Sequence, residues 1–202
     1  MTMSSRLLKT EREKTMLMRT ALFSLLFTLA TVSSLSAQEE EQEPEPKKPQ
    51  AVVEASIGET KNVHQCGQLF LAGQFTTGDI SKISEAGIKR VITLRTEGEI
   101  DWDEKAALKA VGLDLIEVPF RGTESLTDEV FDEIRKLLAD KETATLFHCG
   151  SANRVGGVWL PFRVLDEGVE LETALQEAKK IGLRNPGYEK KALEYIKRKQ
   201  SE

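Results

Sequence analysis

The sequence has few of the residues that bind metals or cross-link a chain. Its 202 residues include two cysteines, Cys66 and Cys149, and two histidines, His64 and His148. A disulfide-rich scaffold needs more cysteines, and no Cys/His spacing typical of a metal site is present. The composition therefore excludes a small disulfide-stapled fold, and we expect neither a metal nor another cofactor.

A long apolar run and an excess of positive charge are also missing. The apolar stretch over residues 21–32 is short for a membrane span. The formal net charge is −5, and an acidic chain repels nucleic acid. We therefore expect no nucleic-acid partner, and no stable membrane anchor once the amino-terminal segment has been removed.

The amino end has the pattern of an export signal. Arg19 precedes the apolar stretch, and small residues end at Ala37, where a signal peptidase could cleave. We expect residues 1–37 to be a signal peptide and the protein to be exported, to the periplasm or the extracellular space. Residues 38–60 are predicted to be an acidic, proline-punctuated linker, and residues 61–202 are predicted to form one domain.

Apolar strands alternate with helical patterns along the predicted domain. Strands are predicted near residues 69–72, 91–94, 115–118 and 144–148. Helices are predicted over residues 77–86, 101–110, 127–139, 155–165, 171–181 and 186–199. This alternation is typical of an α/β fold, with a mostly parallel central sheet flanked by helices on both faces. Ligands of such sheets bind beyond the carboxyl ends of the strands.

A cysteine and an arginine bracket the turn after the last predicted strand. Residues 148–154 read His-Cys-Gly-Ser-Ala-Asn-Arg, so Cys149 lies where the strand passes into a helix. The unpaired N–H groups and the dipole of a helix start favour a thiolate there. Arg154 adds a planar cation that can bind two oxygens of an oxyanion.

The pattern therefore predicts an anion-binding loop that contains a nucleophile. We expect Cys149 and Arg154 to be catalytic. The residues expected to bind the oxyanion are Gly150, Ser151, Ala152, Asn153 and Arg154. Gly156 and Gly157 are expected to let the following helix pack close to the sheet. For the side chains of Ser151 and Asn153, simple stabilisation of the turn is an open alternative.

The loop resembles the signature of the cysteine-based phosphatases, of tyrosine and dual-specificity type, which reads His-Cys, five residues, Arg. Here four residues separate Cys149 from Arg154. That shorter count is similar to the phosphatase-like domain of the beta-lactamase-hydrolase-like family. Residues 71–75, 87–95 and 118–120 also resemble segments of that family. The resemblance covers about residues 67–184.

This resemblance implies a single phosphatase-like domain and a phosphorylated or other oxyanionic substrate. It implies that Cys149 attacks phosphorus without a cofactor and that His148 orders the loop through hydrogen bonds. A buried strand-end histidine satisfied by backbone is the alternative for His148.

One position departs from the family pattern. The family places an aspartate just beyond the strand that ends near Val118, to protonate the leaving oxygen, whereas this chain has Arg121-Gly122. Glu124 and Asp128 are the nearest acids and the candidate general acids. Loss of a general acid costs about 10²-fold or more in rate. Arg121 and Arg184 are either solvated surface residues or readers of an anionic substrate.

Two other functions stay open. The short loop and the missing acid also fit a rhodanese-like sulfurtransferase, in which Cys149 accepts sulfur. A non-catalytic module that binds an anion or a partner protein is the third alternative.

Cys66 is expected to be a buried free thiol, although pairing with Cys149 would inactivate the enzyme. Arg95, Glu97 and Glu99 are expected to form a structural ion-pair cluster at a strand end.

Overall fold

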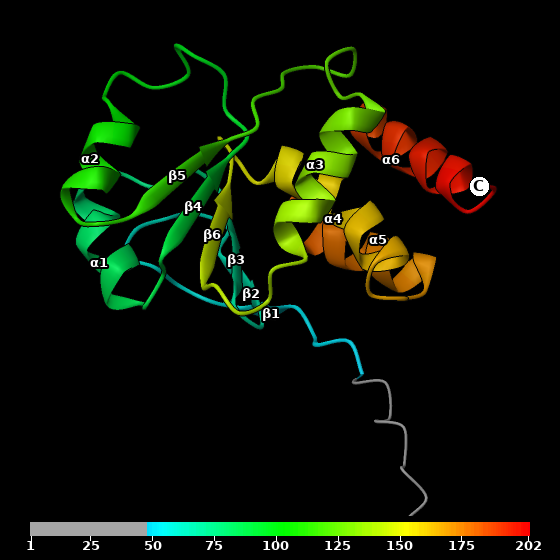
Figure 1. Ribbon diagram of the computed structural model, residues 1–202, viewed down its shortest axis with the longest axis horizontal. Coiled ribbons are helices and arrows are strands. Elements are labelled where there is room, and N and C mark those ends of the chain that lie inside the picture. The colour runs from blue at the N-terminus through cyan, green and yellow to red at the C-terminus, as the bar shows by residue number, and fades with distance from the viewer. Residues whose placement is uncertain (1–47) are drawn as a thin grey trace, which may run out of the picture. The chain divides into compact units, whose positions relative to one another are not determined.

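The computed structural model describes residues 48–202, so the predicted signal peptide lies outside the described residues and stays a prediction. One sheet of six strands runs through this part of the chain (Figure 1). The strands are β1 (Val53–Glu54), β2 (His64–Cys66), β3 (Leu69–Ala72), β4 (Arg90–Thr93), β5 (Asp114–Glu117) and β6 (Thr145–His148). The helices are the 3-10 turn η1 (Thr77–Asp79), α1 (Ile80–Glu85), α2 (Glu104–Ala110), α3 (Asp128–Leu138), α4 (Asn153–Leu165), α5 (Leu171–Ile181) and α6 (Pro186–Lys199). Among residues 48–202, no helix combines the length and the hydrophobicity needed to cross a bilayer.

The sheet is mostly parallel, which confirms the predicted α/β fold class. The strand order is β1-β2-β3-β6-β4-β5. β3, β6, β4 and β5 are parallel neighbours, whereas β1 and β2 extend the sheet from β3 with antiparallel pairing. β1 and β2 were not predicted, because strands of two and three residues are too short to give a detectable alternation.

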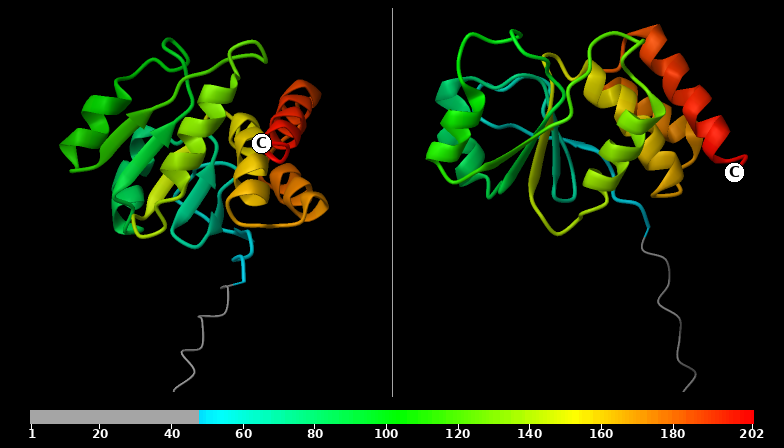
Figure 2. Two further views of the ribbon diagram at one scale, coloured as in Figure 1. Left: turned by 45° about the vertical axis from the view of Figure 1, so that its right-hand side comes forward. Right: turned by 45° about the horizontal axis from the view of Figure 1, so that its top comes forward.

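Helices cover both faces of the sheet, as Figures 1 and 2 show, with α1 and α2 on one face and α3 to α6 on the other. Neighbouring residues of a strand point to opposite faces. Val91 and Leu146 accordingly belong to the core beneath α1 and α2, and Ile92 and Phe147 to the larger core beneath α3 to α6. Because the central strands are buried on both faces, they read as continuous apolar runs in the sequence.

Helix α4 is enclosed by the rest of the larger core. Every residue from Arg154 to Arg163 is buried, and α4 packs against α3, α5 and α6. An apolar surface on all sides is what such a position requires. The helix links two arginines, Arg154 in its first turn and Arg163 in its last, and its ends are about 18 Å apart at 1.5 Å per residue.

The end of the predicted linker is part of the fold. Val52 and Ile57 are buried, one in each core cluster, and β1 pairs with β2. These two apolar side chains stand among polar neighbours without a helical or strand period, so no pattern in the sequence indicated their burial.

Candidate active site

Cys149 directly follows β6, at the edge of the sheet where the parallel strands end. The connections after β3, β4 and β5 start at the same edge. The residue is 1% exposed, and its amide donates to the Ala72 carbonyl at 3.4 Å. The structure therefore places the predicted nucleophile where parallel sheets bind their ligands.

The loop after Cys149 carries backbone N–H groups that lack partners. Ala152 has a left-handed φ of 61°, and α4 begins at the next residue, Asn153. Within residues 48–202, the amides of Gly150 and Ser151 donate to no backbone carbonyl. The first-turn amides of a helix have no partner inside the helix either. Unpaired amides that lead into a helix form a cradle for an anion.

The loop is held from outside through its carbonyl groups. The carbonyl of Gly150 accepts from the Gln74 amide at 3.2 Å, and that of Ser151 accepts from Asn62 Nδ2 at 3.4 Å. On the other side Gly182 adopts a φ of 146°, and a Cβ there would lie 3.1 Å from the Cβ of Ala152. The carbonyls are thus engaged by the surroundings, while the N–H groups stay available.

Arg154 ends the loop in the sequence, and hydrogen bonds hold its guanidinium beside Gly150, near the beginning of the loop. Its Nη1 donates to the carbonyls of Leu94 at 2.8 Å and Phe120 at 2.9 Å. Its two terminal nitrogens also donate to the two oxygens of Glu99, at 2.8 and 2.5 Å. A Cβ built on Gly150 would lie 3.7 Å from Nη2. Bidentate pairing with a carboxylate fixes the plane of the cation.

Glu99 supplies the charge that balances Arg154. Burial opposes ionisation of this carboxyl, but hydrogen bonds from Arg154 and Thr96 outweigh it and lower the pKa of Glu99 to about 2. Burial likewise opposes the charge of Arg154, and the bonds to Glu99 outweigh it and raise the pKa of that arginine. The expected strand-end ion-pair cluster is therefore divided, because Glu99 pairs with Arg154 and Arg95 pairs with Glu104.

His148 lies at the end of β6 and is fully buried. Its Nε2 is 3.3 Å from Glu104 Oε1, and its ring is 5.0 Å from the ring of Phe75. Within residues 48–202, neither ring nitrogen has a well-aligned hydrogen bond, and a buried polar atom in that state costs about 1–3 kcal/mol. Burial, aided by the charge of Arg95, lowers the pKa of His148 to about 3, so the imidazole is neutral at physiological pH.

Glu104, the first residue of α2, joins His148 to a buried arginine. Its Oε2 accepts from Arg95 Nη2, and its Oε1 is 3.5 Å from Gln74 Nε2. Arg95 and Glu104 are 8% and 5% exposed. Burial raises the pKa of Glu104, and the charge of Arg95 together with the hydrogen bonds from Arg95 and Gln74 opposes that rise. A pocket of about 570 Å³, lined also by Trp102, opens beside this pair.

The side chain of Asn153 braces a neighbouring connection. Its Oδ1 accepts from the backbone amides of Arg184 at 2.8 Å and Asn185 at 3.1 Å. Because the side-chain oxygen is engaged in this way, the backbone N–H is the group with which Asn153 can bind an anion. Ser151 is half-buried in the loop.

Gly156 and Gly157 do not face the sheet, contrary to the expectation. A Cβ on Gly156 would lie 2.6 Å from the carbonyl oxygen of Ala178 and 2.8 Å from the amide of Leu183, and one on Gly157 would lie 3.1 Å from Tyr188. The two glycines let α4 approach the end of α5 and the start of α6. The sequence showed close packing but not the direction in which it occurs.

The two candidate general acids differ in their surroundings. Asp128, the first residue of α3, pairs with Arg198 of α6 at 2.6 Å, and hydrogen bonds from Arg198 lower its pKa. A carboxylate held ionised in this way is a poor proton donor. Glu124 is exposed, and the Thr123 hydroxyl donates to its Oε1 at 3.5 Å.

Of the two arginines proposed to read an anionic substrate, one lies at the loop. Arg184 is exposed, and its Nη1 donates to the carbonyls of Ser151 at 3.5 Å and Gly182 at 3.2 Å. Arg121 is also exposed, and its backbone amide donates to the Ser125 hydroxyl. Arg184 thus borders the loop, as the sequence allowed but did not decide.

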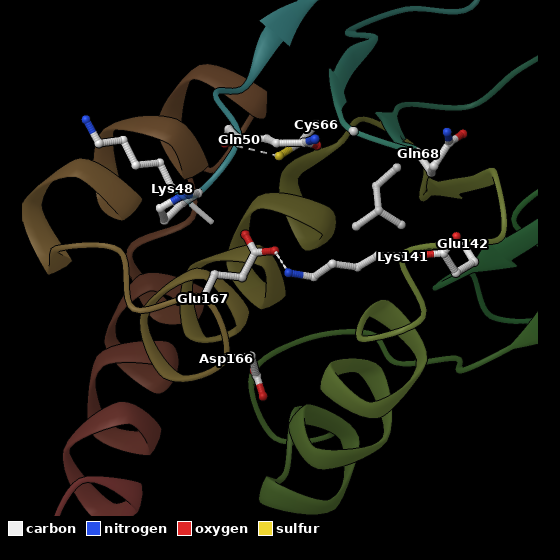
Figure 3. Close-up of a pocket in the computed structure, with 11 residues that line it drawn as sticks. Lys48, Gln50, Cys66, Gln68, Lys141, Glu142, Asp166 and Glu167 are labelled. Atoms are coloured by element: carbon white, nitrogen blue, oxygen red, sulfur yellow. Dashed lines mark hydrogen bonds and ion pairs between the residues drawn. The ribbon is translucent and has the colours of Figure 1, made fainter. Parts of the chain in front are cut away.

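Cys66 lies at the opposite end of the sheet from Cys149, and both are buried free thiols. It lines a pocket of about 510 Å³ that contains no residue of the anion loop (Figure 3). The thiol donates to the Gln50 carbonyl at 3.4 Å, and Arg163 Nη1 lies 3.9 Å from its sulfur. Burial raises the pKa of Cys66 to about 11. This surface hollow and the candidate site are therefore separate.

Sequence reasoning missed Glu99 and Glu104 as members of the site. Glu99 was assigned only to a structural cluster, although its spacing from Thr96 gives a local turn in which both groups of Thr96 donate to it. Glu104 follows the helix cap Asp103 and reads as an ordinary acid that favours the helix dipole. Nothing in the sequence indicates that it turns inward.

The chain is similar to solved phosphatase structures. Tk-PTP in its active form matches with a TM-score of 0.59 and 16% identity, over 65% of this chain and 93% of that one. TpbA from P. aeruginosa matches with a TM-score of 0.58 and 20% identity, over 74% and 90%. The core catalytic domain of the PP-IP phosphatase SIW14 from S. cerevisiae matches with a TM-score of 0.59 and 17% identity, over 72% and 94%. No family model and no curated protein matches the sequence. Taken with the sheet order and the loop after β6, these likenesses show that the chain has the fold of the cysteine-based phosphatases.

Proposed function

We propose that this protein is a cysteine-dependent phosphatase of tyrosine or dual-specificity type that hydrolyses phosphoric monoesters. One observation carries the proposal. The thiol of Cys149 stands at the start of a loop whose amides are unpaired and whose last residue, Arg154, is held in one plane by Glu99. This arrangement suits the three non-bridging oxygens of a phosphoryl group.

In the proposed reaction the Cys149 thiolate attacks phosphorus, and the ester P–O bond breaks as the S–P bond forms. The leaving oxygen departs with the electron pair of the P–O bond and takes a proton from solvent water. Water then attacks the cysteinyl phosphate, breaks the S–P bond and releases inorganic phosphate and the thiolate. The loop amides and Arg154 stabilise the charge on the phosphoryl oxygens in both steps.

The missing aspartate restricts the substrates that we propose. Without a strong proton donor near Arg121, an ester whose leaving group is already a weak base should react best. We therefore propose aryl phosphates, such as phosphotyrosine, in preference to alkyl phosphates. TpbA, one of the structural neighbours, was crystallised in complex with pTyr, which supports the same substrate class.

The test compares two reactions on the purified protein. We expect turnover of p-nitrophenyl phosphate that depends on Cys149, and turnover of an alkyl phosphate that is slower by about 10²-fold or more. Thiosulfate with cyanide serves as the second assay, because it reports sulfur transfer to the same cysteine. Cys149-dependent turnover of thiosulfate alone would replace the phosphatase proposal by a sulfurtransferase, and turnover of neither would leave a module that only binds an anion.

A further inference from the structure

His148, the residue before the proposed nucleophile, has ring nitrogens that lack hydrogen bonds within the described part of the chain and that take no part in the proposed reaction. His148 is fully buried, and neither of its ring nitrogens has a well-aligned hydrogen bond among residues 48–202. Buried polar side chains are nearly always paired, so an exception needs a physical explanation. Its chain neighbour Cys149 is the proposed nucleophile, so the position of His148 affects the position of that residue.

One carboxylate oxygen is placed to meet that requirement. Glu104 Oε2 is engaged by Arg95. Its Oε1 accepts a long hydrogen bond of 3.5 Å from Gln74 Nε2 and lies 3.3 Å from His148 Nε2. A carboxylate oxygen accepts and does not donate, so it favours the neutral imidazole with its proton on Nε2. The charge of Arg95 compensates Glu104, which lets a carboxylate persist at 5% exposure beneath the loop.

His148 Nε2 and Glu104 Oε1 are close enough for a hydrogen bond, but the N–H group does not point at the oxygen. Hydrogen bonds that serve catalysis are often long or poorly aligned in an empty site and tighten when substrate binds. Phe75 packs 5.0 Å from the imidazole and limits the directions in which the ring can turn. A small rotation of His148 toward Glu104 would therefore fix the strand end from which Cys149 projects.

We propose that Glu104 is a positioning residue for Cys149, acting through His148, and that Arg95 holds Glu104 in place. The proposal rests on the proposed nucleophilic role of Cys149. It assigns to α2, on the far face of the sheet, a part in orienting the loop. The same arrangement of a carboxylate that orients an imidazole occurs wherever a histidine must be held in one tautomer and one direction.

The decisive variant is Glu104→Gln, which keeps the size of the side chain. An amide has one acceptor oxygen, so it can satisfy Arg95 or His148 but not both. We expect kcat for p-nitrophenyl phosphate to fall by about 10- to 100-fold, the range found when the hydrogen-bond partner of a metal-binding histidine is removed. KM should change little, because the amides and Arg154 that bind phosphate are untouched. The rate of Cys149 alkylation by iodoacetate should fall as well.

A double variant separates positioning from mere stability. In Arg95→Gln/Glu104→Gln, the side-chain carbonyl of the glutamine at position 95 can accept from the side-chain NH₂ of the glutamine at position 104. The side-chain oxygen at position 104 is then free to accept from His148. We expect this protein to recover most of the lost kcat. Glu117→Gln, the same change at an exposed residue of β5, is the matched control and should leave kcat unchanged.

Each rate is divided by the folded fraction measured by thermal unfolding. The proposal is overturned if folded Glu104→Gln keeps the kcat and the alkylation rate of the unmodified protein, or if the double variant is as impaired as the single one. Alkylation of Cys149 does not require phosphatase activity. If p-nitrophenyl phosphate is not hydrolysed at all, the proposed function fails, and the alkylation rates still decide the role of Glu104.

Discussion

The two ends of helix α4 place a cysteine and an arginine in opposite electrostatic surroundings. At the amino end Arg154 and Cys149 meet unpaired amides, and a single carboxylate, Glu99, balances the cation. At the carboxyl end Arg163 lies 3.9 Å from the sulfur of Cys66 and is surrounded by acceptors. These acceptors are Glu167, both oxygens of Glu177 and the carbonyl of Gln50.

The difference shows that a cysteine beside an arginine does not by itself make a nucleophile. Both thiols are buried, but Arg163 has no donor to spare for a ligand, and desolvation raises the pKa of Cys66 to about 11. The amino end adds what the carboxyl end lacks, namely the positive end of the helix dipole and N–H groups without acceptors. We therefore expect the direction of the helix to decide which of the two cysteines reacts.

The largest effect should come from exchanging the two cysteines for serine. We expect Cys149→Ser to lower the turnover of p-nitrophenyl phosphate by at least about 10⁴-fold, since the attacking sulfur is lost. Cys66→Ser should leave turnover within a factor of about two, because this residue faces the opposite end of the sheet. Equal losses in both variants, measured on folded protein, would remove the distinction between the two ends.

The two arginines should separate activity from stability. We expect Arg154→Lys to keep the fold and lose about 10²- to 10³-fold in kcat, because an ammonium cannot replace the bidentate guanidinium. Arg163→Met should instead lower the free energy of unfolding by about 3–5 kcal/mol, since it leaves Glu177 partly buried without its cation and leaves Glu167 paired with Lys141 alone. Kinetics and urea unfolding of both variants measure the two effects. A large loss of stability with Arg154→Lys would contradict the assignment.

We expect acid to lower the free energy of unfolding through His148 and Glu99, which lie near the amino end of α4. The pKa of His148 is lowered from 6.5 to about 3, so the folded state resists a proton that the unfolded chain accepts. Its contribution is complete above pH 6.5 and is lost as pH falls toward 3, with a slope of at most about 1.4 kcal/mol per pH unit. Glu99, with a pKa lowered from 4.5 to about 2, adds a loss of the same sign below pH 4.5.

Urea unfolding between pH 7 and pH 4 measures this dependence, and His148→Gln should flatten it. An unchanged slope in that variant would show that another group controls the acid sensitivity.

The smallest perturbation is chemical labelling of the unmodified protein. With iodoacetamide at pH 8 we expect Cys149 to be alkylated and Cys66 to stay unmodified, because its raised pKa keeps the second thiol protonated. Inorganic phosphate should slow the labelling of Cys149 by occupying the loop. Mass spectrometry of the labelled peptides distinguishes the two sites. Faster labelling of Cys66, or no protection by phosphate, would contradict the comparison.

The sequence predicted those features that depend on long or local patterns. The central strands and all six helices were predicted because apolar runs and helical periods extend over many residues, and Cys149 with Arg154 was found because both belong to one short turn. Strands β1 and β2 were too short to be recognised. Glu99 and Glu104 were not identified because their partners, Arg154 and His148, are 55 and 44 residues away in the chain. Only the folded sheet brings these pairs together.

The bond from Asn153 to the backbone of residues 184 and 185 has a consequence for how the chain can be divided. A fragment that ends before Arg184 would retain the nucleophile, the guanidinium and every strand of the sheet. It would nevertheless lose the two backbone N–H groups that hold the side chain of Asn153, the first residue of α4. The connection between α5 and α6 is therefore part of the candidate site, and we expect the smallest fragment that keeps the proposed activity to extend at least through Asn185.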